Sequence, residues 1–124
     1  MSNYQDLDIY KISLDLFYKI HPATFLLPKH ELYELGSQLR RSSDSVNSNI
    51  VEGYGRKAYK SDFIKFLIFS HSSCLETKNH LVKISHLYSG IIPNIDVFIK
   101  DYDNLGAKIF SFIKYVQQNW KTDN

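Results

Sequence analysis

The chain has 124 residues, a formal net charge of +2, 44% hydrophobic residues and 23% charged residues, which is typical of one folded domain over residues 1–124. This composition excludes a disordered or collagen-like chain, and the charge falls short of a strongly basic nucleic-acid binder. One cysteine, Cys74, excludes an intrachain disulfide and a cysteine-based zinc site. The start of the chain has no signal-peptide pattern and no apolar run approaches ~20 residues, so we expect a cytoplasmic protein without membrane contact.

Apolar residues recur at helical spacing in four segments, beginning with residues 6–20. Pro22 and Pro28 bracket an extended connector after this first segment, because each proline disfavours helix at the residue before it. The second segment begins near Pro28, which suits an early helical position, and ends around Gly53 and Gly55.

The third predicted helix begins at Ser61, a plausible N-cap, and stops at Ser89 and Gly90. The fourth opens after Pro93, with Asn94 as a candidate cap, and has the clearest apolar periodicity in the chain. Four amphipathic helices joined by short turns pack most simply as an all-α, antiparallel up-down-up-down four-helix bundle.

Residues 40–49, RRSSDSVNSN, conflict with this pattern because Ser, Asp and Asn favour caps and turns over helix interiors. Propensity alone predicts a break in the second helix here. The alternative is that the small side chains lie against a neighbouring helix, a neighbouring subunit or a central channel. A conflict between local preference and overall pattern marks this strip as a place for function or assembly.

The same region resembles a known family. Residues 36–57, GSQLRRSSDSVNSNIVEGYGRK, followed by KSDFIKFL and LETKNHL, resemble the four-helix-bundle family of 23S rRNA intervening-sequence proteins. The matching residues of the second helix are Ser37, Gln38, Arg40, Arg41, Ser48, Asn49, Ile50, Glu52, Gly53, Gly55 and Arg56. The chain departs from the family pattern at Asn47, where proline is usual, and at Cys74, where an acidic residue is usual. The resemblance implies an antiparallel bundle that assembles into a ring-like homopentamer, without known catalysis and with a nucleic-acid-binding role.

A basic and aromatic set surrounds the turn between the second and third segments. Its members are Arg56, Lys57, Lys60, Lys65, Tyr54 and Tyr59. Cations with interleaved tyrosines favour phosphate contact combined with base stacking, and a ring would repeat the patch. The competing interpretation is that these surface lysines only keep the protein soluble, and that Asp62 partly neutralises their charge.

A second polar set is predicted to be structural. It consists of Arg40, Arg41, Asp44, Asn49, Glu52 and Glu76. Asp44 lies four residues after Arg40 and three after Arg41, and Glu76 on the next helix is placed to meet one guanidinium. Asn49 and Glu52 share a helix face, so we expect all six residues to form one internal network.

Two residue pairs have a spacing that suits metal ligation, His71 with Cys74 and Glu76 with His80. Bundle metal sites need carboxylates from several helices and repeated Glu-x-x-His motifs, so we expect no metal and no cofactor. Cys74 lies in an apolar stripe, so we expect no catalytic residue and no small-molecule substrate. The sequence therefore favours a non-enzymatic homo-oligomer that binds RNA or DNA, and the alternative is a protein-assembly module with no nucleic-acid role.

Overall fold

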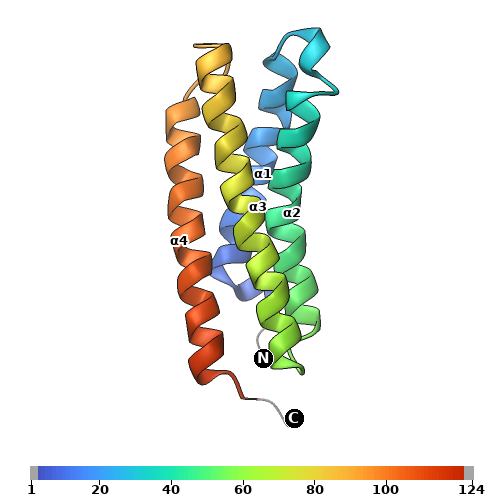
Figure 1. The fold of residues 1–124 in the computed structure, drawn as a ribbon, viewed down its shortest axis with the longest axis vertical. Helices are drawn as coiled ribbons and strands as arrows, with labels where there is room; N and C mark the ends of the chain where they lie inside the picture. Colours follow the sequence, from blue (N-terminus) through green and yellow to red (C-terminus); the bar gives the residue numbers. More distant parts are fainter. Residues whose placement is uncertain (1–2, 122–124) are drawn as a thin grey trace.

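The computed structural model describes residues 3–121, which form four long helices packed side by side (Figure 1). The helices are α1 (Asp8–Ala23), α2 (Leu35–Gly55), α3 (Lys60–Leu87) and α4 (Ile95–Asn119), with short 3-10 turns η1 (Tyr4–Asp6), η2 (Thr24–Leu26) and η3 (Lys29–Glu31). Residues 3–121 contain no β-strand. The predicted all-α class and the four helices are therefore confirmed.

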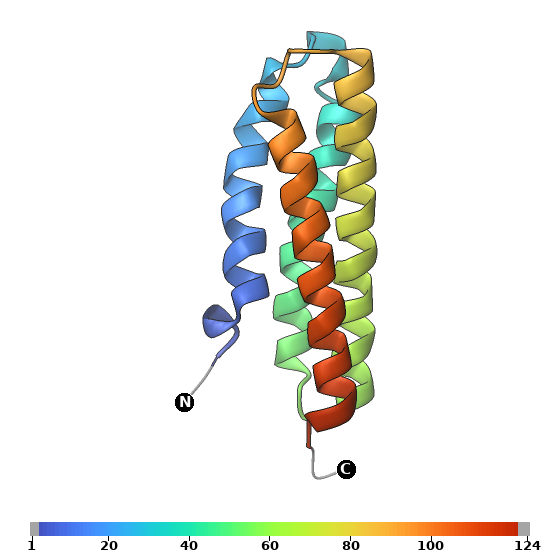
Figure 2. The same ribbon diagram turned by 90° about the vertical axis from the view of Figure 1, so that its left-hand side faces the viewer.

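Side-chain contacts give the register between neighbouring helices. Thr77 on α3 donates to Ser42 on α2 at 2.9 Å, and Ser70 donates to the Val46 carbonyl at 2.6 Å, so α2 and α3 run in opposite directions. Between α1 and α2, the Asn47 amide donates to the Ser13 hydroxyl at 3.2 Å. Figures 1 and 2 show the chain passing from one end of the bundle to the other along each successive helix.

The buried face of each helix follows the predicted periodicity. On α4 the buried residues recur every three or four positions: Tyr102, Leu105, Ile109, Ile113 and Val116. This spacing places one stripe of the helix against the other three, as an amphipathic helix in a bundle requires. None of the helices within residues 3–121 has both the length and the apolar character needed to cross a bilayer.

Several helix boundaries differ from the prediction. α1 continues through Pro22 to Ala23, where the Thr24 N–H donates to carbonyl groups of its last turn, and η2 follows directly. α2 begins at Leu35 rather than near Pro28, since residues 29–31 form a 3-10 turn and residues 32–34 a hydrogen-bonded turn. These connector residues are held by a distant contact, in which the Tyr88 hydroxyl donates to the Glu31 carboxylate at 2.6 Å.

The predicted caps of the last two helices also differ in detail. Ser61 lies inside α3, whose N-cap is Tyr59 without a side-chain capping bond. Asn94 does precede α4, but its side chain makes no capping bond. Asn94 instead adopts the left-handed backbone conformation, with φ of 62°, which asparagine tolerates better than most residues.

Candidate nucleic-acid interface

The turn between α2 and α3 is short and held by backbone hydrogen bonds. The Arg56 N–H donates to the Gly53 carbonyl at 3.0 Å, and the Tyr59 N–H donates to the Arg56 carbonyl at 2.9 Å. The Trp120 indole N–H donates to the Lys57 carbonyl at 3.0 Å, which ties the end of α4 to this turn. The turn is therefore fixed to three helices at one end of the bundle.

Gly53 allows α2 and α3 to approach closely beside this turn. A Cβ at residue 53 would lie 3.1 Å from the Phe66 Cβ and 3.3 Å from the Phe63 carbonyl oxygen. A Cβ at Gly55, the last residue of α2, would meet nothing within 4 Å. Gly53 is thus an interior helix residue required for close packing, and only Gly55 marks the predicted helix end.

Three of the predicted cations pack against aromatic rings. The Arg56 guanidinium lies 4.7 Å from the centroid of Phe66, and the Lys65 ammonium lies 5.5 Å from the same ring. The Lys57 ammonium lies 4.0 Å from the ring of Tyr54. Cation–π contacts of this kind hold a long side chain while leaving its charge at the surface.

The two predicted tyrosines have different surroundings. Tyr59 is 60% exposed at the turn. Tyr54 is only 6% exposed, and its ring packs edge-on against Phe63 at 6.1 Å. Tyr59 can therefore offer a ring face to a base, whereas Tyr54 supports Lys57 from the core.

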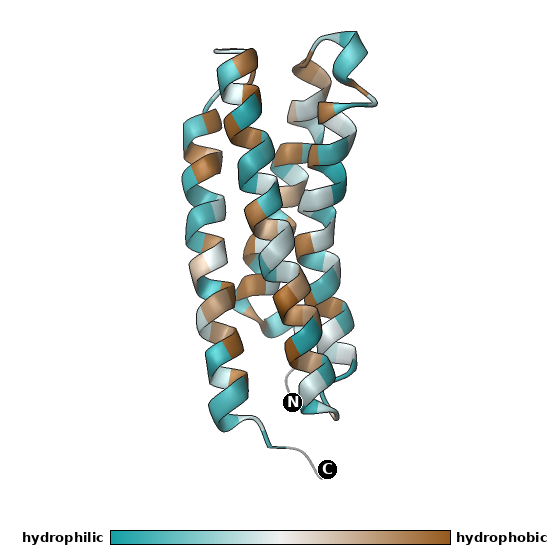
Figure 3. Ribbon diagram, in the orientation of Figure 1, coloured by the Kyte–Doolittle hydropathy of each residue, from teal (hydrophilic) through white to brown (hydrophobic). Residues whose placement is uncertain are grey.

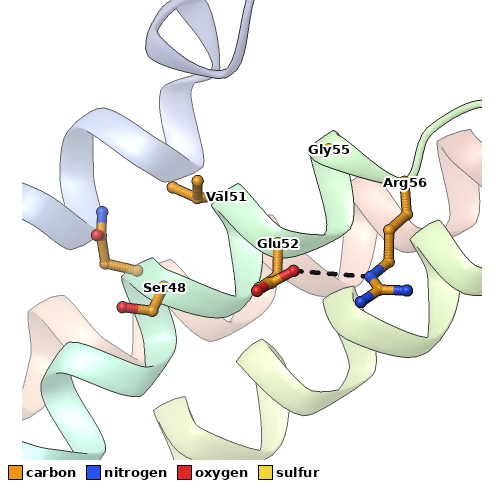
Figure 4. Close-up of a pocket in the computed structure, with 6 residues that line it drawn as sticks. Ser48, Val51, Glu52, Gly55 and Arg56 are labelled. Atoms are coloured by element: carbon orange, nitrogen blue, oxygen red, sulfur yellow. Dashed lines mark ion pairs between the residues drawn. The ribbon is translucent and has the colours of Figure 1, made fainter.

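Carboxylates partly neutralise this basic end. Arg56 lies 3.6 Å from the Glu52 carboxylate and 3.8 Å from the Asp62 carboxylate. Both separations exceed the usual length of a charge-assisted hydrogen bond, and the Arg56 side chain is 47% exposed, so these pairs are weak. Glu52 and Arg56 also border an open hollow on the outer face of α2, together with Ser48, Val51 and Gly55 (Figure 4).

The serine-rich strip of α2 is continuous helix and faces α3. Thr77 donates to Ser42, and the Ser73 hydroxyl donates to the Ser45 hydroxyl at 2.8 Å. Ser42 and Ser43 are buried and donate to the Leu39 carbonyl within their own helix. The strip keeps its helical form because each buried hydroxyl has a partner, and its small side chains let α3 pack closely.

The predicted polar set does not converge on one network. Arg40 donates to the Thr24 hydroxyl and to the Leu32 carbonyl, each at 2.7 Å, and its guanidinium lies 5.0 Å from the Phe25 ring centroid. Arg40 therefore binds the connector before α2 instead of Asp44 or Glu76. Arg41 is exposed, and no ion pair involves it within residues 3–121.

The remaining members of that set have local partners. Asp44 accepts a hydrogen bond from Ser48 at 3.3 Å, and the Asn49 amide donates to the Ser45 hydroxyl at 2.9 Å. Glu76 lies 3.2 Å from the Nε2 of His80, one turn along α3. Residue spacing along the helix predicted the contacts of this set only in part. Side-chain rotamers and the contacts of Arg40 with the connector decide which groups pair.

The pairs considered for metal binding do not gather a third ligand, since residues 3–121 contain no group of three His, Cys, Asp or Glu side chains suited to an ion. The His71 ring lies 6.0 Å from that of Phe110. Burial, with a smaller contribution from the Asp103 carboxylate, raises the pKa of the Cys74 thiol to about 12. The thiol donates to the Tyr102 carbonyl at 3.2 Å, so it is neutral and enclosed near neutral pH.

The fold and the basic turn together define a small all-α bundle that carries a cation–aromatic surface at one end. A family model for 23S rRNA-intervening sequence proteins matches residues 5–111, and the chain belongs to this family. The match extends the resemblance from the middle of the chain almost to its N-terminus. The comparison with curated proteins finds no match.

Proposed function

We propose that this chain is a non-enzymatic, cytoplasmic subunit of a homo-oligomer, a pentameric ring in the favoured form, that binds RNA or DNA through the turn between α2 and α3. The assembling unit is one antiparallel up-down-up-down bundle. The observation that carries the proposal is the cluster of Arg56, Lys57 and Lys65 on aromatic rings beside the exposed Tyr59.

This cluster has the chemistry that a flexible nucleic-acid backbone requires. Cations already held on rings lose little side-chain freedom on binding, which lowers the entropic cost of a phosphate contact. Phosphate oxygens can replace the weak ion pairs of Arg56 at 3.6 Å and 3.8 Å. The exposed ring of Tyr59 adds a stacking surface for a base. Repetition of the patch around an assembly raises the overall affinity through multivalency.

The second candidate function is protein assembly without any nucleic acid. It is favoured by apolar side chains on the outer face of α3, where Leu75 is 57% exposed. An exposed apolar face marks an interaction surface in a folded protein. The two candidates differ in their response to salt, because phosphate contacts weaken steeply as salt rises and apolar contacts do not.

The test is a titration of the purified protein with labelled single-stranded and duplex RNA and DNA at about 50 mM and about 200 mM salt. A complex with six to ten phosphate contacts should lose affinity by a factor of about 10³ or more over this range. The triple variant Arg56→Ala, Lys57→Ala, Lys60→Ala should bind weakly at both salt concentrations. Its mass in light scattering should equal that of the unchanged chain.

A matched control removes the same charges elsewhere. The variant Lys29→Ala, Arg41→Ala, Lys100→Ala also loses one arginine and two lysines, all three of which are exposed and distant in sequence from the turn. It should keep most of the binding. An equal loss of nucleic-acid affinity in both triple variants would show that net charge alone explains the binding. Absence of binding at low salt would leave protein assembly as the function.

A further inference from the structure

The outer face of α3 carries an apolar stripe that the bundle does not use. Ile68, Leu75 and Val82 lie seven residues apart and are 46%, 57% and 46% exposed. Seven residues are almost two helical turns, so these side chains follow one line along the helix. A different face of α3 supplies the core with residues such as Leu67 and Leu81. In Figure 3 hydrophobic segments recur along α3, which lies at the front of that view.

A groove lies elsewhere on the bundle, between α1 and α4. Two neighbouring hollows of about 650 Å³ and about 450 Å³ follow these helices and share Lys108. Their partly exposed apolar lining includes Leu7, Ile12 and Phe112. Figure 2 shows α1 and α4 diverging toward the end of the bundle that holds the start of α1. This side of the bundle is therefore concave and partly apolar.

The charges around the groove alternate along its length. Asp8 lines one end, Lys11 and Lys108 line the middle, and Asp101 lines the other end. Lys19 also borders the groove, but it already pairs with Asp15 at 3.0 Å. Along the groove, the residues of the rim are therefore acidic at one end, basic in the middle and acidic at the other end.

Beside the stripe, α3 carries Glu76 and, seven residues later, Lys83, while Lys78 already pairs with Asp103 of the same chain at 2.6 Å. Glu76 is 59% exposed and can reach a neighbouring molecule. The stripe from residue 68 to residue 82 is about 21 Å long, and the α1 side of the groove from residue 8 to residue 19 is about 17 Å long. The two lengths are therefore similar, and the seven-residue spacing of Glu76 and Lys83 on α3 equals the spacing of Lys108 and Asp101 on α4.

We propose that the α3 stripe of one copy docks in the α1–α4 groove of a second copy. The proposal rests on the homo-oligomer of the proposed function and names its contact surfaces. Glu76 meets Lys11 and Lys108, and Lys83 meets the Asp101 end of the groove, since about 10 Å separates Glu76 from Lys83 along α3. This pairing sets the incoming α3 parallel to α1.

The parallel pairing has a consequence for assembly. Within one chain α1 and α3 already run in the same direction (Figure 1), so copies joined in this way have parallel bundle axes. The stripe and the groove are different surfaces, which makes the contact head-to-tail, and such contacts generate rings when the rotation closes. A stripe-to-stripe contact would instead be isologous and stop at a dimer.

A mixing experiment tests the docking surfaces. Leu75→Glu disables the stripe, and Lys11→Glu with Lys108→Glu reverses the middle of the groove. Each variant alone should have the mass of one chain in light scattering, and an equimolar mixture should form a species of two chains through the one intact contact. Adding Glu76→Lys to the groove variant should restore assembly. Tyr33→Glu, a control at a residue 82% exposed in the connector, should assemble like the unchanged chain.

The outcomes separate this proposal from the proposed function. If the groove variant keeps the mass of an assembled wild type, or the mixture stays monomeric, the docking surfaces are wrong while oligomerisation stands. A monomeric wild type overturns both. Loss of nucleic-acid binding alone leaves the docking surfaces untouched. Circular dichroism checks that each variant is helical, and Ile68→Lys replaces Leu75→Glu should that variant unfold.

Discussion

The close approach of α2 and α3 at Gly53 makes a sharp prediction about stability. In Gly53→Ala the new Cβ would lie 3.1 Å from the Phe66 Cβ, 3.3 Å from the Phe63 Cδ1 and 3.3 Å from the Phe63 carbonyl oxygen. A backbone oxygen cannot rotate away, so the two helices must separate locally. Overpacking of this kind costs about 2 kcal/mol, and the better helix propensity of alanine returns about 1 kcal/mol. We expect a net loss of about 1 kcal/mol.

Gly55→Ala is the matched control in the same helix. Its Cβ meets no atom within 4 Å, so the substitution gains propensity without a clash and should stabilise the protein by about 0.5 kcal/mol. The assay is urea unfolding followed by circular dichroism at one protein concentration, because assembly couples stability to concentration. If Gly53→Ala were as stable as Gly55→Ala, the two helices would separate at no cost and the packing argument would fail.

Arg40→Ala removes two hydrogen bonds, to Thr24 and Leu32, and should cost about 2 kcal/mol in urea unfolding; a change near zero would show that water replaces both bonds. The Cys74 thiol, with its pKa raised to about 12, should react with iodoacetamide at pH 8 about 10³ times more slowly in the folded protein than in urea. Because this pKa exceeds the unfolded value of 9.0, its contribution to stability is complete below pH 9 and falls by about 1.4 kcal/mol per pH unit between pH 9 and 12. Cys74→Ala should abolish the decline between pH 9 and 10, above which the buried Tyr102, whose pKa burial also raises, adds to it.

The sequence predicts the helices well because their signal is local. The stripe on α4, from Tyr102 to Val116, is visible in the spacing of apolar residues alone, and the same residues are buried in the fold. The start of α2 could not be predicted in this way. Glu31 accepts a hydrogen bond from Tyr88, which lies 57 residues later, and a contact over that distance leaves no local pattern.

The serine strip shows how tertiary contacts override propensity. Ser, Asp and Asn favour turns in isolation, yet Ser42 and Ser45 sit within an unbroken helix because α3 supplies Thr77 and Ser73 as partners. The candidate site likewise combines features that the sequence predicts with features that depend on tertiary contacts. Charge and aromatic content predicted a cluster near Arg56, whereas the burial of Tyr54 and the bond from Trp120 to the turn depend on how three helices meet.

The polar contact between α2 and α3 also bears on the exposed stripe of α3. Serine and threonine side chains bury little apolar area, so the part of this interface formed by Ser42, Ser45, Ser73 and Thr77 contributes fixed geometry more than hydrophobic free energy. A bundle with hydroxyl pairs in one part of this interface has a smaller apolar core than its helix lengths allow. α3 nevertheless carries Ile68, Leu75 and Val82 on its outer face, where an isolated chain leaves these side chains about half exposed to water. Burial of that stripe against a second copy would supply the missing apolar area, which links the internal polar seam to assembly.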